Sequence, residues 1–157
     1  GNDDHIGLDL VVPFVIRSPD GKSETRARIK GGLLGHWSIW TKTSVDMLRE
    51  IQALPEGADV PADLLAIDSI VTDCNGAIYD AVNDLKGCNP GCLEVLSRQG
   101  LVQGTWCLDP DEKLSPGQVE EIDRVCRAYP EMNDDGFVAD NLHRWLSDAG
   151  RGVPLVA

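Results

Sequence analysis

Two small groups of residues have side chains that could carry out acid–base or metal chemistry. Asp3, Asp4 and His5 are adjacent at the beginning of the chain, and His36 follows Gly35 inside an apolar run. Carboxylates and imidazoles are common general acids and bases, and both also bind zinc. Each group has a structural alternative. Terminal polar residues are usually solvated, and a histidine within an apolar run is more often a hydrogen-bonded structural residue than a catalyst.

The chain has five cysteines, which are Cys74, Cys88, Cys92, Cys107 and Cys126. An odd number leaves at least one thiol free, which favours a reducing compartment and predicts a cytoplasmic protein. Cys88 and Cys92 form a C-x-x-x-C pair, which together with Cys107 could hold a small metal site. Their spacing is not that of a zinc ribbon. We therefore expect five reduced, unliganded cysteines, no metal and no cofactor.

Length and charge restrict the function further. The chain has 157 residues, of which 42% are hydrophobic and 25% charged, with a formal net charge of −12. This is the size and composition of one globular domain. Nucleic acid and anionic membrane surfaces would repel such a chain. No run of 18 apolar residues is present, so we expect no membrane span.

The first third of the chain is predicted to be rich in strands. Residues 8–16 are rich in β-branched residues, and residues 23–30 alternate between apolar and charged side chains. With the turn residues between them they predict a β-hairpin over 8–30. Residues 33–40 form a short apolar run that predicts a buried strand, and the apolar spacing over 42–54 predicts a helix.

The rest of the chain, residues 62–150, is predicted to be helical. Apolar periodicity predicts a long helix over 62–85 that could break near Gly76. Pro90 is expected to begin the next helix, which Gly100 ends in a left-handed conformation. Ser115 is expected to cap a helix that reaches about Ala128, and a last helix is expected over 135–148.

Short motifs in this order resemble the carboxy-terminal part of the dihydrodipicolinate synthase / N-acetylneuraminate lyase family. Residues 1–4 are similar to the turn after that family's seventh strand, and residues 31–36 to its Gly-rich eighth strand. Residues 91–100 resemble a late helix of the family, and residues 108–116 its closing connection. The hairpin over 8–30 would then be an insertion.

The resemblance implies the carboxy-terminal portion of an α/β (β/α)8 barrel, a TIM barrel, with an inserted hairpin and closing helices. It also implies a lyase, of the class I aldolase type, that binds a 2-oxo acid as a Schiff base. The catalytic lysine would lie outside this chain, which would be inactive alone. The residues implied to bind substrate are Gly1, Asp3, Asp4, Gly35 and His36, at the carboxyl ends of strands.

The sequence leaves a second interpretation open, in which a hairpin joins a helical bundle in an α+β fold. The chain would then be a non-enzymatic interaction module that offers an acidic surface to a basic partner. Under the barrel interpretation we expect residues 1–157 to be a partial domain. Closing the sheet would require companion strands from upstream sequence or from another subunit of an oligomer.

Overall fold

A computed structural model describes residues 5–33, 35–55 and 57–147; of His36 it describes the backbone alone. The described part is helical apart from one small antiparallel hairpin, which fits the coarse α/β or α+β class. The elements are α1 (Ile6–Val11), β1 (Phe14–Arg17), β2 (Glu24–Ala27), η1 (His36–Ser38), α2 (Thr41–Ala53), α3 (Ala62–Ile78), η2 (Ala81–Asn83), α4 (Cys88–Arg98), α5 (Gln118–Ala128), η3 (Pro130–Met132) and α6 (Asp135–Ser147).

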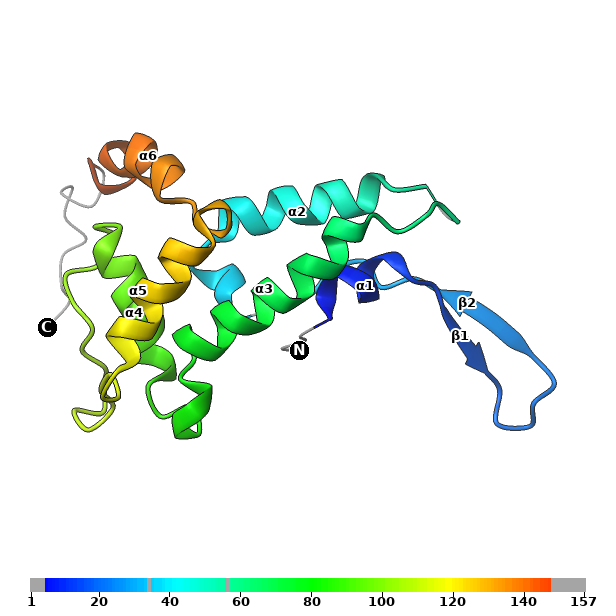
Figure 1. Cartoon of the computed structure of the whole chain (residues 1–157), viewed down its shortest axis with the longest axis horizontal. Coiled ribbons are helices and arrows are strands. Elements are labelled where there is room, and N and C mark those ends of the chain that lie inside the picture. Colours follow the sequence, from blue (N-terminus) through cyan, green and yellow to red (C-terminus); the bar gives the residue numbers. More distant parts are fainter. Residues whose placement is uncertain (1–4, 34, 56, 148–157) are drawn as a thin grey trace, which may run out of the picture.

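The core is built around α3, which runs through the centre of the body (Figure 1). One part of α3 packs against α1, and another packs against α4 and α5. Trp40, just before α2, is fully buried, as are Val71 and Ile78 of α3 and Ile122 of α5. No helix of the described residues is long and apolar enough to cross a membrane.

The prediction of a strand over 8–16 is wrong in its first half. Residues 6–11 form the short helix α1, whose Ile6 and Leu10 are both buried. This spacing of four places both side chains on one helical face. The helix ends at Val11 because Pro13 disfavours a helical conformation at the residue before it.

The predicted hairpin is present, but it is shorter than expected and both of its faces are exposed. Phe14 pairs with Ala27 and Arg17 with Glu24, and all eight strand residues are exposed. The turn is closed by a hydrogen bond from Ser18 N to Ser23 O at 3.0 Å, and Gly21 has φ +69°. We call residues 13–30 the arm, because it projects from one end of the body (Figure 1).

A single arginine fixes the base of the arm to the body. Arg28 donates from Nε to Leu10 O at 2.7 Å, from Nη2 to Ile51 O at 3.1 Å and from Nη1 to Leu54 O at 3.3 Å. These carbonyls lie at the carboxyl ends of α1 and α2, where helices leave acceptors unpaired and favour a positive charge. Arg28 therefore ties the base of the arm to α1 and α2, together with the hydrogen bond from Gln52 Nε2 to Lys30 O.

The prediction of a buried strand over residues 33–40 is wrong. The described residues of this segment contain the single 3-10 turn η1, and α2 follows directly. Ser38 N donates to Gly35 O at 3.1 Å, and Thr41 Oγ1 donates to Trp37 O at 2.8 Å. The apolar run buries Ile39 and Trp40 through these turns, and no strand in the described part lies beside it to form a ladder.

The later helices follow the sequence prediction, with shifted boundaries. Helix α3 passes through Gly76 and ends at Ile78 instead of residue 85. Helix α4 begins two residues before Pro90, and α5 begins after Gly117, which has φ +85°, so Ser115 is not its cap. The left-handed conformation of Gly100 is confirmed, with φ +78°, and α2 and α6 match their predicted ranges closely.

Two helical glycines provide a matched test of this packing. A Cβ on Gly91 would clash with the carbonyl oxygen of Ile78, whereas a Cβ on Gly76 would meet nothing within 4 Å. We expect Gly91→Ala to lower the free energy of unfolding by about 3 kcal/mol or more, through forced displacement of backbone. Gly76→Ala should raise it by about 1 kcal/mol. Urea unfolding followed by circular dichroism measures both, and a tolerated Gly91→Ala would contradict the close α3–α4 approach.

Candidate functional site

The five residues implied to bind substrate are only partly described. Gly1, Asp3 and Asp4 lie outside the described residues, and so does the side chain of His36. Gly35 is described and lies against the ring of Tyr79, so closely that a Cβ there would clash with the ring. The site is therefore neither assembled nor excluded by the described residues.

The surroundings of Gly35 contain a buried phenol and a thiol. The Tyr79 hydroxyl interacts with Ser38 and Cys92, and burial raises the pKa of Tyr79 well above its usual range. Burial also raises the pKa of the Cys92 thiol. Both groups are therefore protonated at neutral pH, and neither has the lowered pKa of an activated nucleophile.

The cysteines do not gather into a metal site in the described part. All five thiols are free, and burial is the main cause of a raised pKa for Cys74, Cys88 and Cys126. Within residues 5–33, 35–55 and 57–147, no three His, Cys, Asp or Glu side chains are grouped so as to hold a metal ion. Cys88, Cys92 and Cys107, which could form a metal site on the basis of the sequence, are therefore not grouped around a common point in the described part.

A cleft of about 570 Å³ lies between α3 and α5, and its lining includes the ion pair of Asp73 and Arg124. Arg124 binds Asp73 through two hydrogen bonds, of 2.8 and 2.6 Å, and the Tyr129 hydroxyl donates to Asp73 at 2.8 Å. The hydrogen bond from Arg124 is the largest cause of the lowered pKa of Asp73. Arg124 and Tyr129 therefore take up the hydrogen-bonding capacity of the Asp73 carboxylate, and the ion pair joins α3 to α5.

In the wall of the same cleft, Asp80 and Gln118 form a polar network at the end of α3. Asp80 is only 2% exposed and accepts hydrogen bonds from Ser115 Oγ at 2.6 Å, Asn83 Nδ2 at 2.7 Å and Gly87 N at 3.0 Å. Burial works against ionisation of Asp80, yet these three donors together lower its pKa. Gln118 donates to Gly87 O at 2.8 Å, so the two side chains share Gly87. The network connects the end of α3, η2, Gly87 and the segment 115–118, and the Asp80 carboxylate is held by three donors of the protein.

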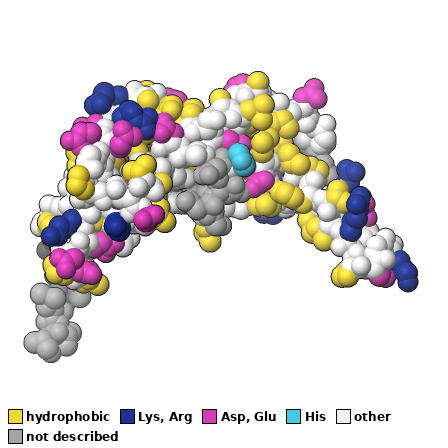
Figure 2. Space-filling view, turned by 60° about the horizontal axis from the view of Figure 1, so that its bottom comes forward, with side chains coloured by type: hydrophobic (Ala, Val, Ile, Leu, Met, Phe, Trp, Pro, Cys, Tyr) yellow, Lys and Arg dark blue, Asp and Glu magenta, His cyan; other side chains and the backbone are white. Residues whose placement is uncertain are grey.

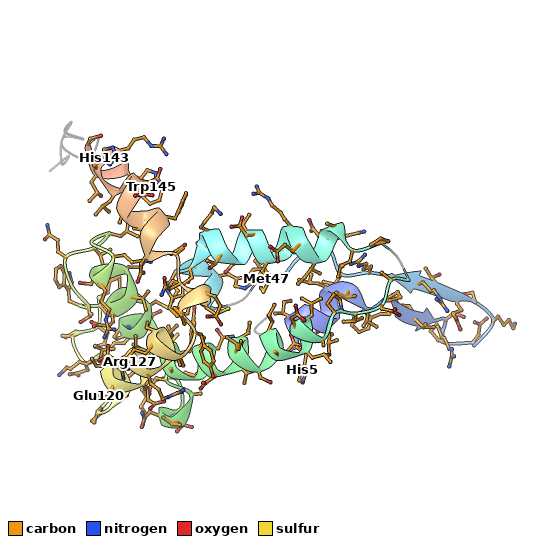
Figure 3. The ribbon with its side chains drawn as sticks, turned by 45° about the horizontal axis from the view of Figure 1, so that its top comes forward. His5, Met47, Glu120, Arg127, His143 and Trp145 are labelled. Carbon is orange, nitrogen blue, oxygen red and sulfur yellow. The ribbon has the colours of Figure 1, made fainter. Side chains whose placement is uncertain are left out.

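A second hollow, of about 510 Å³, is bounded by α2, α3 and η3, and we call it the α2–α3 groove. Its apolar lining is Met47, Ala66, Ile67, Ile70 and Met132. Met47 projects from α2 on the side of α3 (Figure 3). Thr43 Oγ1 donates to Met132 O at 2.8 Å, which holds η3 against α2 at the end of the groove.

The charged lining of the α2–α3 groove is entirely acidic. Four carboxylates line it, those of Asp46, Glu50, Asp63 and Glu131, and no lysine or arginine belongs to its described lining. Asp46 is paired with Lys42 and Arg49. Glu50, Asp63 and Glu131 form no ion pair with any side chain that the structure describes. The groove therefore combines an apolar floor with uncompensated negative charge.

The arm has the opposite charge. Residues 13–30 hold five basic and two acidic residues, a net charge of +3, whereas the rest of the chain holds nine basic and 24 acidic residues, a net charge of −15. Figure 2 shows the basic side chains along the arm, at one end of the molecule. One face of the arm is apolar and solvent-exposed, with Phe14 40%, Ile16 56% and Ile29 41% exposed.

Comparison of the chain with protein-family models, with curated proteins and with solved structures finds no match. The geometry of the groove and the arm is therefore the basis for a functional proposal.

Sequence reasoning missed the α2–α3 groove. Its residues come from three elements, and only Asp46 and Glu50 of its carboxylates show a helical spacing in the sequence. The apolar spacing over 42–54 predicts a helix, but it does not indicate that Met47 lines a groove. The basic character of the arm was readable, because five of the chain's 14 cations fall within residues 17–30.

The Asp80 network predicts a stability loss in acid. The lowered pKa of Asp80 means that its contribution is present above the unfolded value of about 3.9 and is lost as pH falls through the lower folded value. We expect Asp80→Asn to cost about 2 kcal/mol at pH 7, as for hydrogen bonds to a charged group. The cost should shrink below about pH 4.

Urea unfolding at a series of pH values measures this effect. Asp111→Asn is the control, because the Asp111 side chain is 94% exposed and lies in a loop. An Asp80→Asn variant with wild-type stability at pH 7, or with the same deficit at pH 3, would contradict the role of the Asp80 carboxylate.

Proposed function

We propose that this chain is a non-enzymatic protein-interaction module whose α2–α3 groove receives a basic, apolar segment of a partner. The observation that supports the proposal is the lining of the groove, in which an apolar floor is bordered by three carboxylates that form no ion pair within the described part of the chain. Apolar contact supplies affinity, and complementary charge selects the partner and speeds its association.

The character of the other polar groups favours binding over catalysis. The buried carboxylate of Asp80 and the carboxylate of Asp73 are both occupied by hydrogen bonds from the protein. The thiols and the Tyr79 phenol have raised pKa values, so they are poor nucleophiles at neutral pH. A group with a perturbed pKa in an open pocket often marks a catalytic site. Asp73 and Asp80 line the cleft between α3 and α5 with lowered pKa values, but hydrogen bonds from the protein cause that lowering and hold both carboxylates in place.

Photocrosslinking from the groove tests the proposal. With p-benzoylphenylalanine in place of Ile70, ultraviolet light should join the chain to a partner. Peptide mapping should place the bond in a segment rich in Lys or Arg and apolar residues. The double variant Glu50→Lys/Glu131→Lys should reduce the yield about tenfold, and added salt should reduce it as well.

The matched control replaces Leu108, which is exposed and does not line the groove, with the same photoreactive residue. Equal crosslinking from Leu108 and Ile70, or a yield that does not respond to the charge reversals, would overturn the groove as a binding surface.

The resemblance to Schiff-base lyases gives a second proposal, in which the chain is a portion of a barrel enzyme acting on a 2-oxo acid. The order of the short motifs supports it. A difficulty for this proposal is that the segment expected as the eighth strand contains the 3-10 turn η1 instead of a strand. The proposal also requires a lysine from elsewhere, because four of the chain's five lysines are exposed and the fifth, Lys42, is paired with Asp46.

Reductive trapping tests the lyase proposal. Pyruvate and borohydride are added to this chain alone and to the chain with any upstream sequence of its reading frame. The proposal expects a reduced lysine adduct, detected by mass spectrometry, in the longer protein and none in this chain alone. The absence of an adduct in the longer protein would rule out Schiff-base chemistry with pyruvate.

A further inference from the structure

We infer that the partner received by the α2–α3 groove is the arm of a second copy of this chain. The inference rests on the proposed function and names its partner. In this arrangement the apolar face of one arm covers the groove floor of the other copy. Since each copy offers one arm and one groove, two copies can satisfy both contacts in a closed, two-fold symmetric dimer.

The apolar surfaces of the two elements match. The arm presents Phe14, Ile16 and Ile29 on one face, and its two strands have no further strand of the described chain beside them. A two-stranded ribbon that stands alone is only marginally stable in water, and exposed apolar patches usually mark an interaction site. The groove floor, with Met47, Ile67 and Ile70, offers apolar side chains that the body leaves uncovered on that side.

Charge distinguishes this pairing from the other ways in which two copies could associate. Two arms would meet as two surfaces of net charge +3, and two bodies as surfaces of net charge −15, so both contacts are repulsive. An arm against the groove brings Arg26 and Lys30 toward Glu50 and Glu131, all of which are exposed. Arg26 pairs with Val15 and therefore lies on the face of the ribbon opposite Phe14 and Ile16, while Lys30 follows the second strand. The long stem of Arg26 lets its charged group reach past the edge of the ribbon to the rim of the groove.

The position of the arm makes the contact intermolecular. Arg28 fixes the base of the arm to the carboxyl ends of α1 and α2, and Gln52 Nε2 donates to Lys30 O at 2.7 Å. From this base the arm extends away from the body, beyond α2 and α3 (Figure 1). An arm held in this direction cannot fold back onto the groove of its own chain.

Sedimentation of the whole chain over a range of concentrations tests the inference. The wild type should form a dimer that weakens at high salt. Ile16→Asp in the arm and Ile70→Asp in the groove should each weaken the dimer at least tenfold. Val82→Asp should leave the dimer unchanged, because Val82 is exposed and belongs to neither surface. Circular dichroism of each variant confirms that it is folded.

A charge exchange between copies provides the sharpest test. The arm variant Arg26→Glu/Lys30→Glu and the groove variant Glu50→Lys/Glu131→Lys should each be monomeric alone. An equimolar mixture of the two variants should form dimers again. In a mixed dimer the reversed arm meets the reversed groove, and the unchanged arm meets the unchanged groove.

The outcomes separate this inference from the proposed function. A wild type that stays monomeric, or a mixture that fails to associate, overturns the pairing of copies. If the Ile70 photocrosslink then maps to a different protein with a basic, apolar segment, the groove remains a binding surface with another partner. If the photocrosslink also fails, both proposals are wrong.

Discussion

Two buried polar side chains, Asp80 and Gln118, hold together the parts of the chain on which the body depends. Gln118 donates to Ile78 O at 3.1 Å, accepts from Ser115 N at 3.0 Å and shares Gly87 with Asp80. The end of α3 and the starts of α4 and α5 therefore meet at one point. Asp80, Asp84 and Leu85 all have positive φ, which costs about 1–3 kcal/mol each for residues other than glycine. The network offsets part of that strain, because an unmet hydrogen bond in this buried place would cost a comparable amount.

This junction also explains why the α2–α3 groove is open. It fixes one end of α3 against α4 and α5, while α1 packs against the other part of α3 and against α2. Helix α2 is positioned by α1, η1 and η3. The hydrogen bond from Thr43 to Met132 O closes one end of the space between α2 and α3. The remaining space keeps an apolar floor because Met47, Ile67 and Ile70 have no further element of the described chain to cover them.

The sequence predicts those elements whose stability is local. The apolar periodicity of α2 and α6 and the turn of the hairpin could be read directly, because each depends on neighbouring residues. The segments 8–12 and 33–40 were mistaken for strands, since short apolar runs fit a strand or a buried helical turn equally well. The implied site at Gly35 and His36 rests on a strand that the structure replaces with η1. The Asp80–Gln118 network and the groove include contacts between residues up to 40 and 89 positions apart, and a pattern read along the chain does not contain such contacts.

The arm has no role in the packing of the body, yet the structure holds it in a defined direction. Arg28 donates hydrogen bonds to three carbonyls at the carboxyl ends of α1 and α2, at the base of the arm. Beyond that base, both faces of the ribbon are exposed, and no core residue comes from either strand. Exposed apolar side chains such as Ile16 contribute little to folding, so the stability of the body does not depend on them. Folding of the body likewise does not depend on the positive charge of the arm, whose sign is opposite to that of the body. A rigid base, an apolar face and opposite charge are together the properties of an element that is stabilised when a complementary surface covers it.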